Sequence, residues 1–321
     1  MRLIFGFLSF LLKPFFWLYT KVLTMPKPPT PKKKRVVESR AHREIRHALR
    51  RIAMDIKKDP TVHEFNLEQL KSLGIRVDRM TLDGTSPHKK PSYFAPYPAH
   101  LLTLDHDEEE ILQGQYTGID GENYMSLTDP SGRAHTMDIH LRHHIGHCED
   151  YCEEERTPWT SKCIADYPFM EGLYKSFPPA YGCSKTTDLN GSTHPHVKAI
   201  MWQGLVAKDS TILRGELSPI VEIMISQFLQ TRFVDHMVAP VNFTVYLLAI
   251  IISLLSTNIT TMLQVLIISL MGFKARVIEA YFKDQTLILR PSEMLDFTHA
   301  NNAGFKTFVQ WYLGPPIGDT S

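Results

Sequence analysis

The chain has 321 residues, of which 43% are hydrophobic and 21% are charged, and its formal net charge is +1. This composition is typical of a globular protein, and the near-neutral balance excludes a strong overall field that would favour nucleic acid. Four cysteines are too few for a disulfide scaffold in a chain of this length.

Residues 1–24 predict a hydrophobic anchor. They are apolar and aromatic, but Lys13 and Pro14 interrupt them, so they favour a helix lying in a membrane interface over one that crosses the bilayer. The segment has no small-residue cleavage site of the kind that ends a signal peptide. We therefore expect a membrane location, with the basic residues that follow keeping the next region cytosolic.

Residues 25–60 predict a proline-rich basic linker followed by an amphipathic helix over 39–57. Apolar residues recur at helical spacing at Ile45, Leu49, Ile52 and Ile56. The basic residues predict contact with an anionic membrane surface or an acidic protein, through Lys32, Lys33, Lys34, Arg35, Arg43, Arg46 and Arg50. The alternative is a surface helix packed on its own domain.

A second location is indicated by the stretch PKKKRVV at 31–37, which resembles a nuclear localisation signal. If translation starts at Met25, the anchor is lost and the protein is expected in the nucleus.

Residues 61–215 predict an irregular central region with short strands and many turns. The region contains neither a glycine-rich phosphate loop nor a GxSxG elbow, so a nucleotide-driven enzyme or an α/β-hydrolase is not indicated. Its most distinctive stretch is HLRHHIGHCEDYC at 140–152. On a helix, His140, His144 and His147 would share one face, with Cys148 beside them.

Metal binding is the chemistry that this cluster favours. Nitrogen and thiolate ligands suit tetrahedral zinc, and the candidate ligands are His144, His147, Cys148, Cys152 and Cys163. A site made of His144, His147 and His194 would instead be open and catalytic. The alternative is a solvated polar helix with one or two buried thiols.

Residues 216–240 and 265–321 predict a small α+β module. A helix is expected to begin with Ser218 as its cap and Pro219 in its first turn. A strand at 265–272, a hairpin with its turn at 284–285 and an aromatic helix closed by Gly314 follow. We expect Trp311 to pack over the hairpin, whose core residues are Val277, Ala280 and Phe282. The acidic residues of this region form no nuclease pattern, because Tyr281 stands where a lysine would follow Glu279.

Residues 241–264 interrupt this module, and no charged residue occurs from Val241 to Phe273. By hydropathy the segment is a transmembrane helix. The alternative is a retained intron, since the flanking sequences join smoothly into the hairpin when it is removed.

Two resemblances to known families add expectations. The tail, with VLIISLMGFKARVIEAYFKDQTLILR and FKTFVQWYLG, resembles a module of uncharacterised fungal proteins, which implies a fungal source. The HxxHC motif at His144–Cys148, with CxxD at Cys163–Asp166, resembles the ustiloxin-type (UstYa-like) oxidases of fungi. That likeness implies metal or catalytic roles for His144, His147 and Cys148, with Cys163 and Asp166 supporting them. Bound copper or iron would favour such an oxidase, whereas structural zinc would favour a binding module. The family carries two HxxHC motifs and this chain has one.

No complete catalytic constellation is visible in the sequence. The function expected is therefore that of an uncharacterised, membrane-attached fungal protein with a non-catalytic binding role. A metal-dependent oxidase of secondary metabolism is the first alternative, and a nuclear protein with a different start codon is the second.

Overall fold

A computed structural model describes residues 40–83, 89–102, 110–112, 116–121, 128–151, 157–163, 172–189, 195–230 and 263–317. All of these residues belong to one compact unit, Glu38–Ser321. The α+β class is confirmed, because helices and strands both occur throughout this unit. The expected anchor at 1–24, the basic residues 32–35 and most of the segment 241–264 lie outside the described residues.

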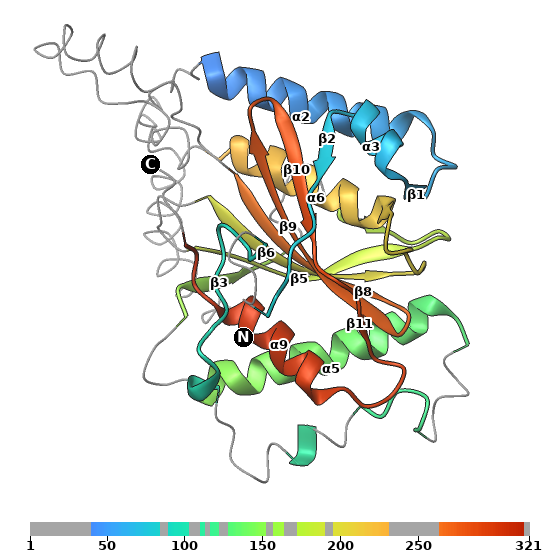
Figure 1. The fold of residues 1–321 in the computed structure, drawn as a ribbon, viewed down its shortest axis with the longest axis vertical. Helices are drawn as coiled ribbons and strands as arrows, with labels where there is room; N and C mark the ends of the chain where they lie inside the picture. Colours follow the sequence, from blue (N-terminus) through green and yellow to red (C-terminus); the bar gives the residue numbers. More distant parts are fainter. Residues whose placement is uncertain are drawn as a thin grey trace, which may run out of the picture. The chain divides into compact units, whose positions relative to one another are not determined.

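A nine-stranded sheet forms the centre of the unit (Figure 1). Along the sheet the strands follow one another as β2 (Ile75–Val77), β10 (Thr286–Pro291), β9 (Lys274–Lys283), β8 (Gln264–Met271), β6 (His196–Gln203), β5 (Tyr181–Leu189) and β3 (Trp159–Lys162). Two short strands attach to this path: β11 (Leu295–Asp296) pairs with β9, and β4 (Tyr174–Lys175) pairs with β5. A separate ribbon joins β1 (Glu64–Phe65) to β7 (Ile212–Leu213).

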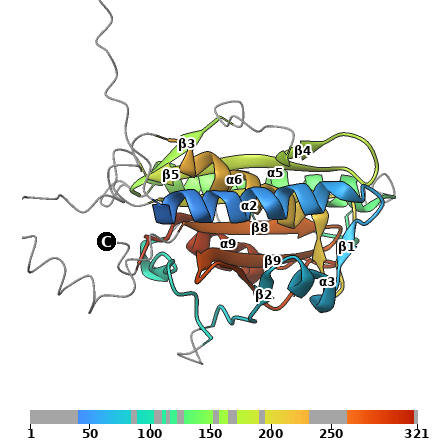
Figure 2. The same cartoon turned by 90° about the horizontal axis from the view of Figure 1, so that it is seen from above.

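Helices cover both faces of the sheet (Figures 1 and 2). On one face α2 (Arg40–Lys58) packs on α6 (Arg214–Phe228), which packs on β8. On the other face lie α5 (Pro130–Tyr151) and α9 (Asn302–Leu313). Because side chains alternate along a strand, β9 serves both cores: Val277 faces the α5–α9 side and Ile278 faces the α2–α6 side. The short helices α3 (Leu67–Ser72) and η1 (Ala99–Leu101) lie in the connections.

Strands from distant parts of the sequence pair directly in this sheet. Strand β6 is parallel to β8, with α6 in the connection between them, and β2 is parallel to β10. Residues before and after the expected boundary at 215/216 therefore share one sheet and one compact unit.

The hairpin of β9 and β10 forms as the sequence indicated. Its turn residues Asp284 and Gln285 both have positive φ, 49° and 61°, the backbone form that suits the twist of a two-residue hairpin. Gly314 follows the last residue of α9, as expected. Val277, Ala280, Phe282 and Trp311 are all buried, but the expectation that they form one core is wrong: Ala280 and Phe282 face the α2–α6 side, whereas Val277 and Trp311 belong to the core on the α5–α9 side.

The expected start of α6 at Ser218 is wrong. The helix begins at Arg214, and Pro219 lies inside it. Proline has no N–H to donate to the carbonyl four residues before it, here that of Gly215. The side-chain amide Nε2 of Gln203 donates to that carbonyl instead, at 3.0 Å. The Glu216 carboxylate supplies the cap, accepting the Leu213 N–H at 2.8 Å.

Part of the expected irregular region is regular structure. β5 and β6 are strands of nine and eight residues, and they contain buried polar side chains, among them Thr186, Thr187 and Lys198. The hydropathy pattern did not reveal these strands, because polar residues interrupt them and turn-forming residues flank them. Likewise, Leu263 and Gln264, the last two residues of the expected transmembrane segment, are buried in the unit, and Gln264 begins β8.

The expectation of a transmembrane helix requires correction. Within the described ranges, no helix combines the length and the apolar character needed to cross a bilayer. The amphipathic helix α2 is accounted for in another way, because Leu49, Ile52 and Ile56 pack into the core of the unit.

Candidate functional site: a basic helix face and a cationic hollow

The histidine-rich stretch lies on α5, as expected, but its side chains do not converge on one point. His144 and Cys148 are buried, while His147 is half-buried and lies beside the ring of His143, with ring centroids 5.9 Å apart. Cys163 is exposed, and Cys152 lies outside the described residues. In the part of the chain that the structure describes, no group of three or more His, Cys, Asp or Glu residues is placed to hold a metal ion. The expectation of metal binding is therefore corrected for these residues.

His140, on the same helix, packs against aromatic side chains. Its ring packs edge-on against Phe305 of α9, with centroids 4.4 Å apart, and lies 5.7 Å from Tyr116. Burial lowers the pKa of His140 to about 4, and the neighbouring His144 and His143 add to this effect. His140 is thus a neutral side chain that packs between α5 and α9.

We expect this packing to make the protein sensitive to acid. The unfolded chain binds a proton at His140 below about pH 6.5, whereas the folded chain resists it until about pH 4. This contribution to stability is complete above the unfolded pKa and is lost as the pH falls through that window. In urea titrations, His140→Phe should flatten the fall in unfolding free energy between pH 7 and pH 4. An unchanged slope would contradict the buried, neutral state.

Three buried acidic residues of the C-terminal region each pair with a basic side chain. Glu216 pairs with Arg276, and the Glu279 carboxylate lies 2.9 Å from Arg290. Glu222 lies 2.9 Å from the Lys57 amine. These carboxylates are thus used in structural ion pairs, and Asp235 lies outside the described residues.

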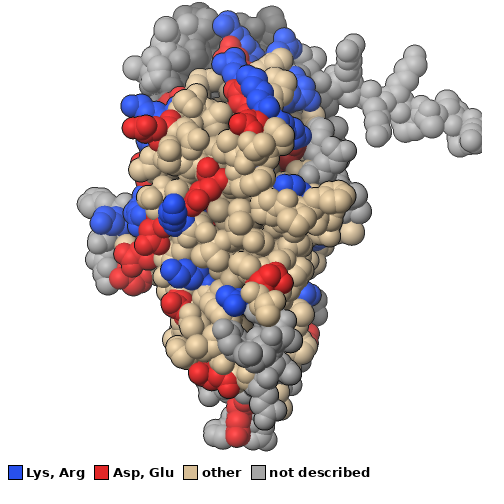
Figure 3. Space-filling view, turned by 90° about the vertical axis from the view of Figure 1, so that its right-hand side faces the viewer, with Lys and Arg blue, Asp and Glu red and all other residues tan. Residues whose placement is uncertain are grey.

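One face of α2 is exposed and basic. Arg43, His47, Arg50 and Met54 follow one another at spacings of four, three and four residues, and all four are exposed. Arg51 is exposed as well, while Arg46 is half-buried. Figure 3 shows lysine and arginine side chains gathered at the end of the molecule where Figure 1 places α2.

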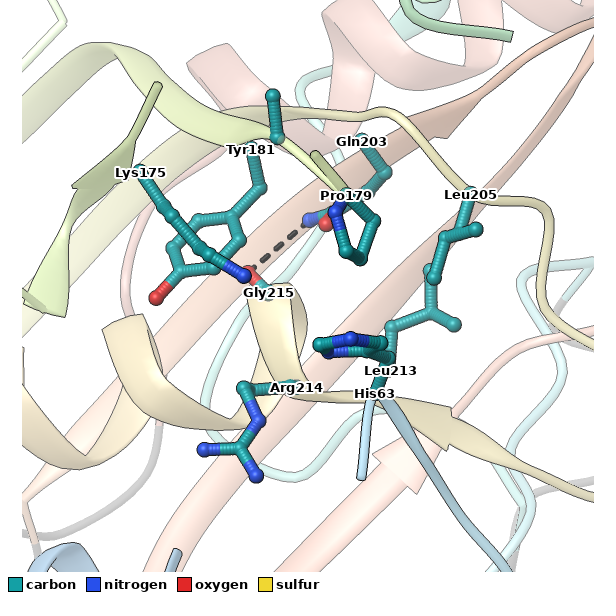
Figure 4. Close-up of a pocket in the computed structure, with 10 residues that line it drawn as sticks. His63, Lys175, Pro179, Tyr181, Gln203, Leu205, Leu213, Arg214 and Gly215 are labelled. Carbon is teal, nitrogen blue, oxygen red and sulfur yellow. Dashed lines mark hydrogen bonds between the residues drawn. The ribbon is translucent and has the colours of Figure 1, made fainter. Parts of the chain in front are cut away.

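Beyond the end of α2 the surface contains a hollow of about 230 Å³, measured out to open solvent (Figure 4). Polar and apolar side chains from five connected elements line it: His63, Lys175, Pro179, Ala180, Tyr181, Gln203, Leu205, Leu213, Arg214 and Gly215. Backbone pairing positions these groups. Tyr181 lies opposite both Lys175 of β4 and Gln203 of β6, and the His63 carbonyl accepts the Arg214 N–H at 2.9 Å.

The ionisable groups that line the hollow favour positive charge. Three of its lining side chains, His63, Lys175 and Arg214, are basic, and no carboxylate lines it. The pKa of His63 is lowered first by burial and then by the charges of Lys175 and Arg214, while Asp59 opposes these effects. A site lined by basic side chains and no carboxylate favours an anion over a cation.

The Arg214 guanidinium connects the hollow to α2. Its Nε donates to the Val62 carbonyl and its Nη1 to the Ile56 carbonyl, both at 2.6 Å, and it also donates to the Asp59 carbonyl. It thereby satisfies backbone acceptors at and just beyond the last turn of α2. Arg214, which lines the hollow, is thus hydrogen-bonded to the backbone at the C-terminal end of α2.

Of the basic residues singled out from sequence, Arg43, Arg46 and Arg50 lie on α2, and Lys32, Lys33, Lys34 and Arg35 lie outside the described residues. His63, Lys175 and Arg214 were missed. Each is isolated in the sequence, and no motif joins them, so only the pairing of β4 with β5 and of β1 with β7 brings them together.

The fold and these surfaces define the class of protein: a mixed sheet between two helical layers, with a basic helix face leading to a cationic hollow. Comparison with known protein families, characterised proteins and solved structures gave no match.

Proposed function

We propose that this protein is a non-catalytic interaction protein that binds an acidic segment of another protein through the exposed basic face of α2. The observation that carries the proposal is the charge of this helix. Seven of its nineteen residues are Lys or Arg, and only Glu44 and Asp55 are acidic. Basic residues crowded in this way repel one another, and an acidic ligand relieves that repulsion.

The internal ion pairs of α2 leave part of this charge uncompensated. Arg40 pairs with Glu44, Lys58 with Asp55, and Lys57 with Glu222 of α6. Within the described residues, no acidic side chain pairs with Arg50 or Arg51. Both are exposed, so their guanidinium groups are accessible to carboxylates of a partner.

The composition of the exposed face of α2 favours a protein partner. The apolar residues of the helix pack against α6 and the core, so the exposed face presents polar groups and one large apolar side chain, Met54, which is 60% exposed. Methionine adapts to irregular partner surfaces, and arginine is enriched in interfaces. A mixed surface of arginines around one methionine fits an acidic peptide that also carries an apolar residue.

Charge reversal on α2 tests the proposal. The double variant Arg50→Glu/Arg51→Glu should weaken binding of a fluorescent peptide of alternating glutamate and leucine by about tenfold or more, because two favourable contacts become repulsive. Fluorescence anisotropy at several salt concentrations measures the loss. Affinity of the unaltered protein should fall as salt rises.

The matched control is Lys274→Glu/Lys283→Glu, which makes the same charge change at exposed positions of β9, remote in sequence from α2. It should bind the peptide nearly as well as the unaltered protein. Equal losses in both variants would reduce the effect to net charge alone and contradict a site on α2. Binding to anionic lipid vesicles without binding to the peptide would contradict a protein partner.

A further inference from the structure

The geometry points to a second site, in the cationic hollow, that binds one small oxyanion between Lys175 and His63. The chemical class is a carboxylate or a phosphate group. The site is separate from the basic face of α2, although Arg214 in its lining donates to a backbone carbonyl at the end of that helix.

Lys175 is the first element of this site. The register of β4 with β5 places Lys175 opposite Tyr181, at the wall of the hollow. The side chain is half-buried, and within the described residues it pairs with no carboxylate. Figure 4 shows its amine extending toward Gly215, at the start of α6. A cation held in a partly buried position without a counterion is stabilised when an anion binds beside it.

His63 is the second element. Its Nδ1 atom is buried and has no hydrogen-bond partner among the described residues. Buried polar atoms of native proteins nearly always have a partner, and His63 lines the hollow, so its ring is the second group that a ligand there can engage. An oxyanion would accept a hydrogen bond from the imidazole on one side and from the Lys175 amine on the other.

The size and lining of the hollow limit the ligand. Pro179, Ala180, Leu205 and Leu213 supply apolar walls, and the space that these walls enclose is about the size of one water molecule, so the hollow is shallow and open to solvent. One oxygen of a carboxylate or phosphate group can enter this space while the rest of the group stays at its mouth, whereas a nucleotide or a large cofactor would not be enclosed. The first turn of α6 adds the positive end of a fifteen-residue helix.

Binding should depend on the protonation of His63. Burial lowers the pKa of His63 most, the charges of Lys175 and Arg214 lower it further, and Asp59 opposes them. A bound anion offsets these effects and raises the pKa of His63. By linkage, the anion then binds more tightly as the pH falls through that pKa.

The experiment follows the imidazole resonances of His63 by NMR in the full ¹⁵N-labelled chain. Sodium acetate and sodium phosphate are titrated separately, with sodium chloride holding the ionic strength constant. We expect a saturable shift of the His63 resonances and a rise in its pKa. Lys175→Met should weaken binding by about tenfold, the usual cost of one charge-assisted hydrogen bond. Lys283→Met, at an exposed lysine of the β9–β10 hairpin, is the control and should bind normally.

The outcomes separate the sources of the oxyanion. Binding of free acetate or phosphate assigns the hollow to a small diffusible anion. Binding only of the acidic peptide, lost in Lys175→Met, assigns it to a side-chain carboxylate of the partner, a reading that rests on the proposed function. Unchanged peptide binding in Arg50→Glu/Arg51→Glu, with free anions still bound in the hollow, would overturn only the proposed role of α2. No saturable response of His63 in the unaltered protein to any of the three probes, or equal affinities in the two lysine variants, would overturn the site.

Discussion

Replacing Arg276 with methionine is expected to lower the free energy of unfolding by about 3 to 5 kcal/mol. Arg276 of β9 and Glu216 of α6 form a two-point ion pair in which the side chains are 1% and 0% exposed. Arg276 Nε lies 2.9 Å from Glu216 Oε1, and Nη2 donates to the second carboxylate oxygen and to the Thr211 carbonyl. Without the guanidinium, a buried carboxylate is left next to apolar side chains, and this desolvated charge dominates the cost.

Guanidinium chloride titrations of three variants measure this effect. In the double variant Arg276→Met/Glu216→Gln the charge is gone from both sides, so much of the lost stability should return. The glutamine oxygen can still accept the Leu213 N–H that caps α6. Arg40→Met, at an ion pair whose arginine is 93% exposed, is the control and should cost less than about 1 kcal/mol. Equal costs for Arg276→Met and Arg40→Met would contradict a strong buried pair.

Lys198→Met is the second large effect, expected at about 3 to 5 kcal/mol. The Lys198 amine is fully buried and donates to the carbonyls of Trp311 and Tyr312, both at 2.9 Å, and of Gly314, at 2.5 Å. It also lies 4.2 Å from the centre of the Trp159 ring. Burial lowers the pKa of Lys198, whereas the carbonyl end of α9 and the aromatic ring favour the ammonium form.

The cost arises because methionine cannot donate to the last carbonyls of α9. Those of Trp311 and Tyr312 lose the Lys198 donor, while Gly314 keeps one bond from the Trp159 indole, at 2.8 Å. Thermal and chemical unfolding should show the loss, and amide hydrogen exchange should show faster opening of the last turn of α9. Lys283→Met, at an exposed lysine, should change stability by less than about 0.5 kcal/mol. A stable Lys198→Met variant with a protected α9 would refute the capping role.

Elements with strong local signals were predicted well. The helical spacing of Leu49, Ile52 and Ile56 identified α2, and the alternation in β9 with a two-residue turn identified the hairpin. These patterns are readable because a helix or hairpin with one buried face repeats its apolar residues at its own period. The exposed arginines of the candidate binding face were accessible from the sequence for the same reason.

Elements stabilised by partners far along the chain were not readable. The start of α6 was misplaced because Pro219 lies inside the helix, where Gln203 of β6 donates to the Gly215 carbonyl that a proline cannot reach. The histidine-rich stretch suggested a metal site, since its residue types match metal ligands. Whether such side chains converge depends on what packs beside them, and here His140 packs against Phe305.

The sequence by itself determined the α+β class, the basic amphipathic helix, the hairpin and the closing helix, because each depends on contacts within a short window of the chain. Only the tertiary structure decided that β2, β6 and β8–β10 share one sheet, that each buried carboxylate of the C-terminal region has a basic partner, and that His63, Lys175 and Arg214 surround one hollow. The physical reason is that a binding surface is defined by distances in space, and strand pairing sets those distances between residues whose sequence positions carry no sign of one another.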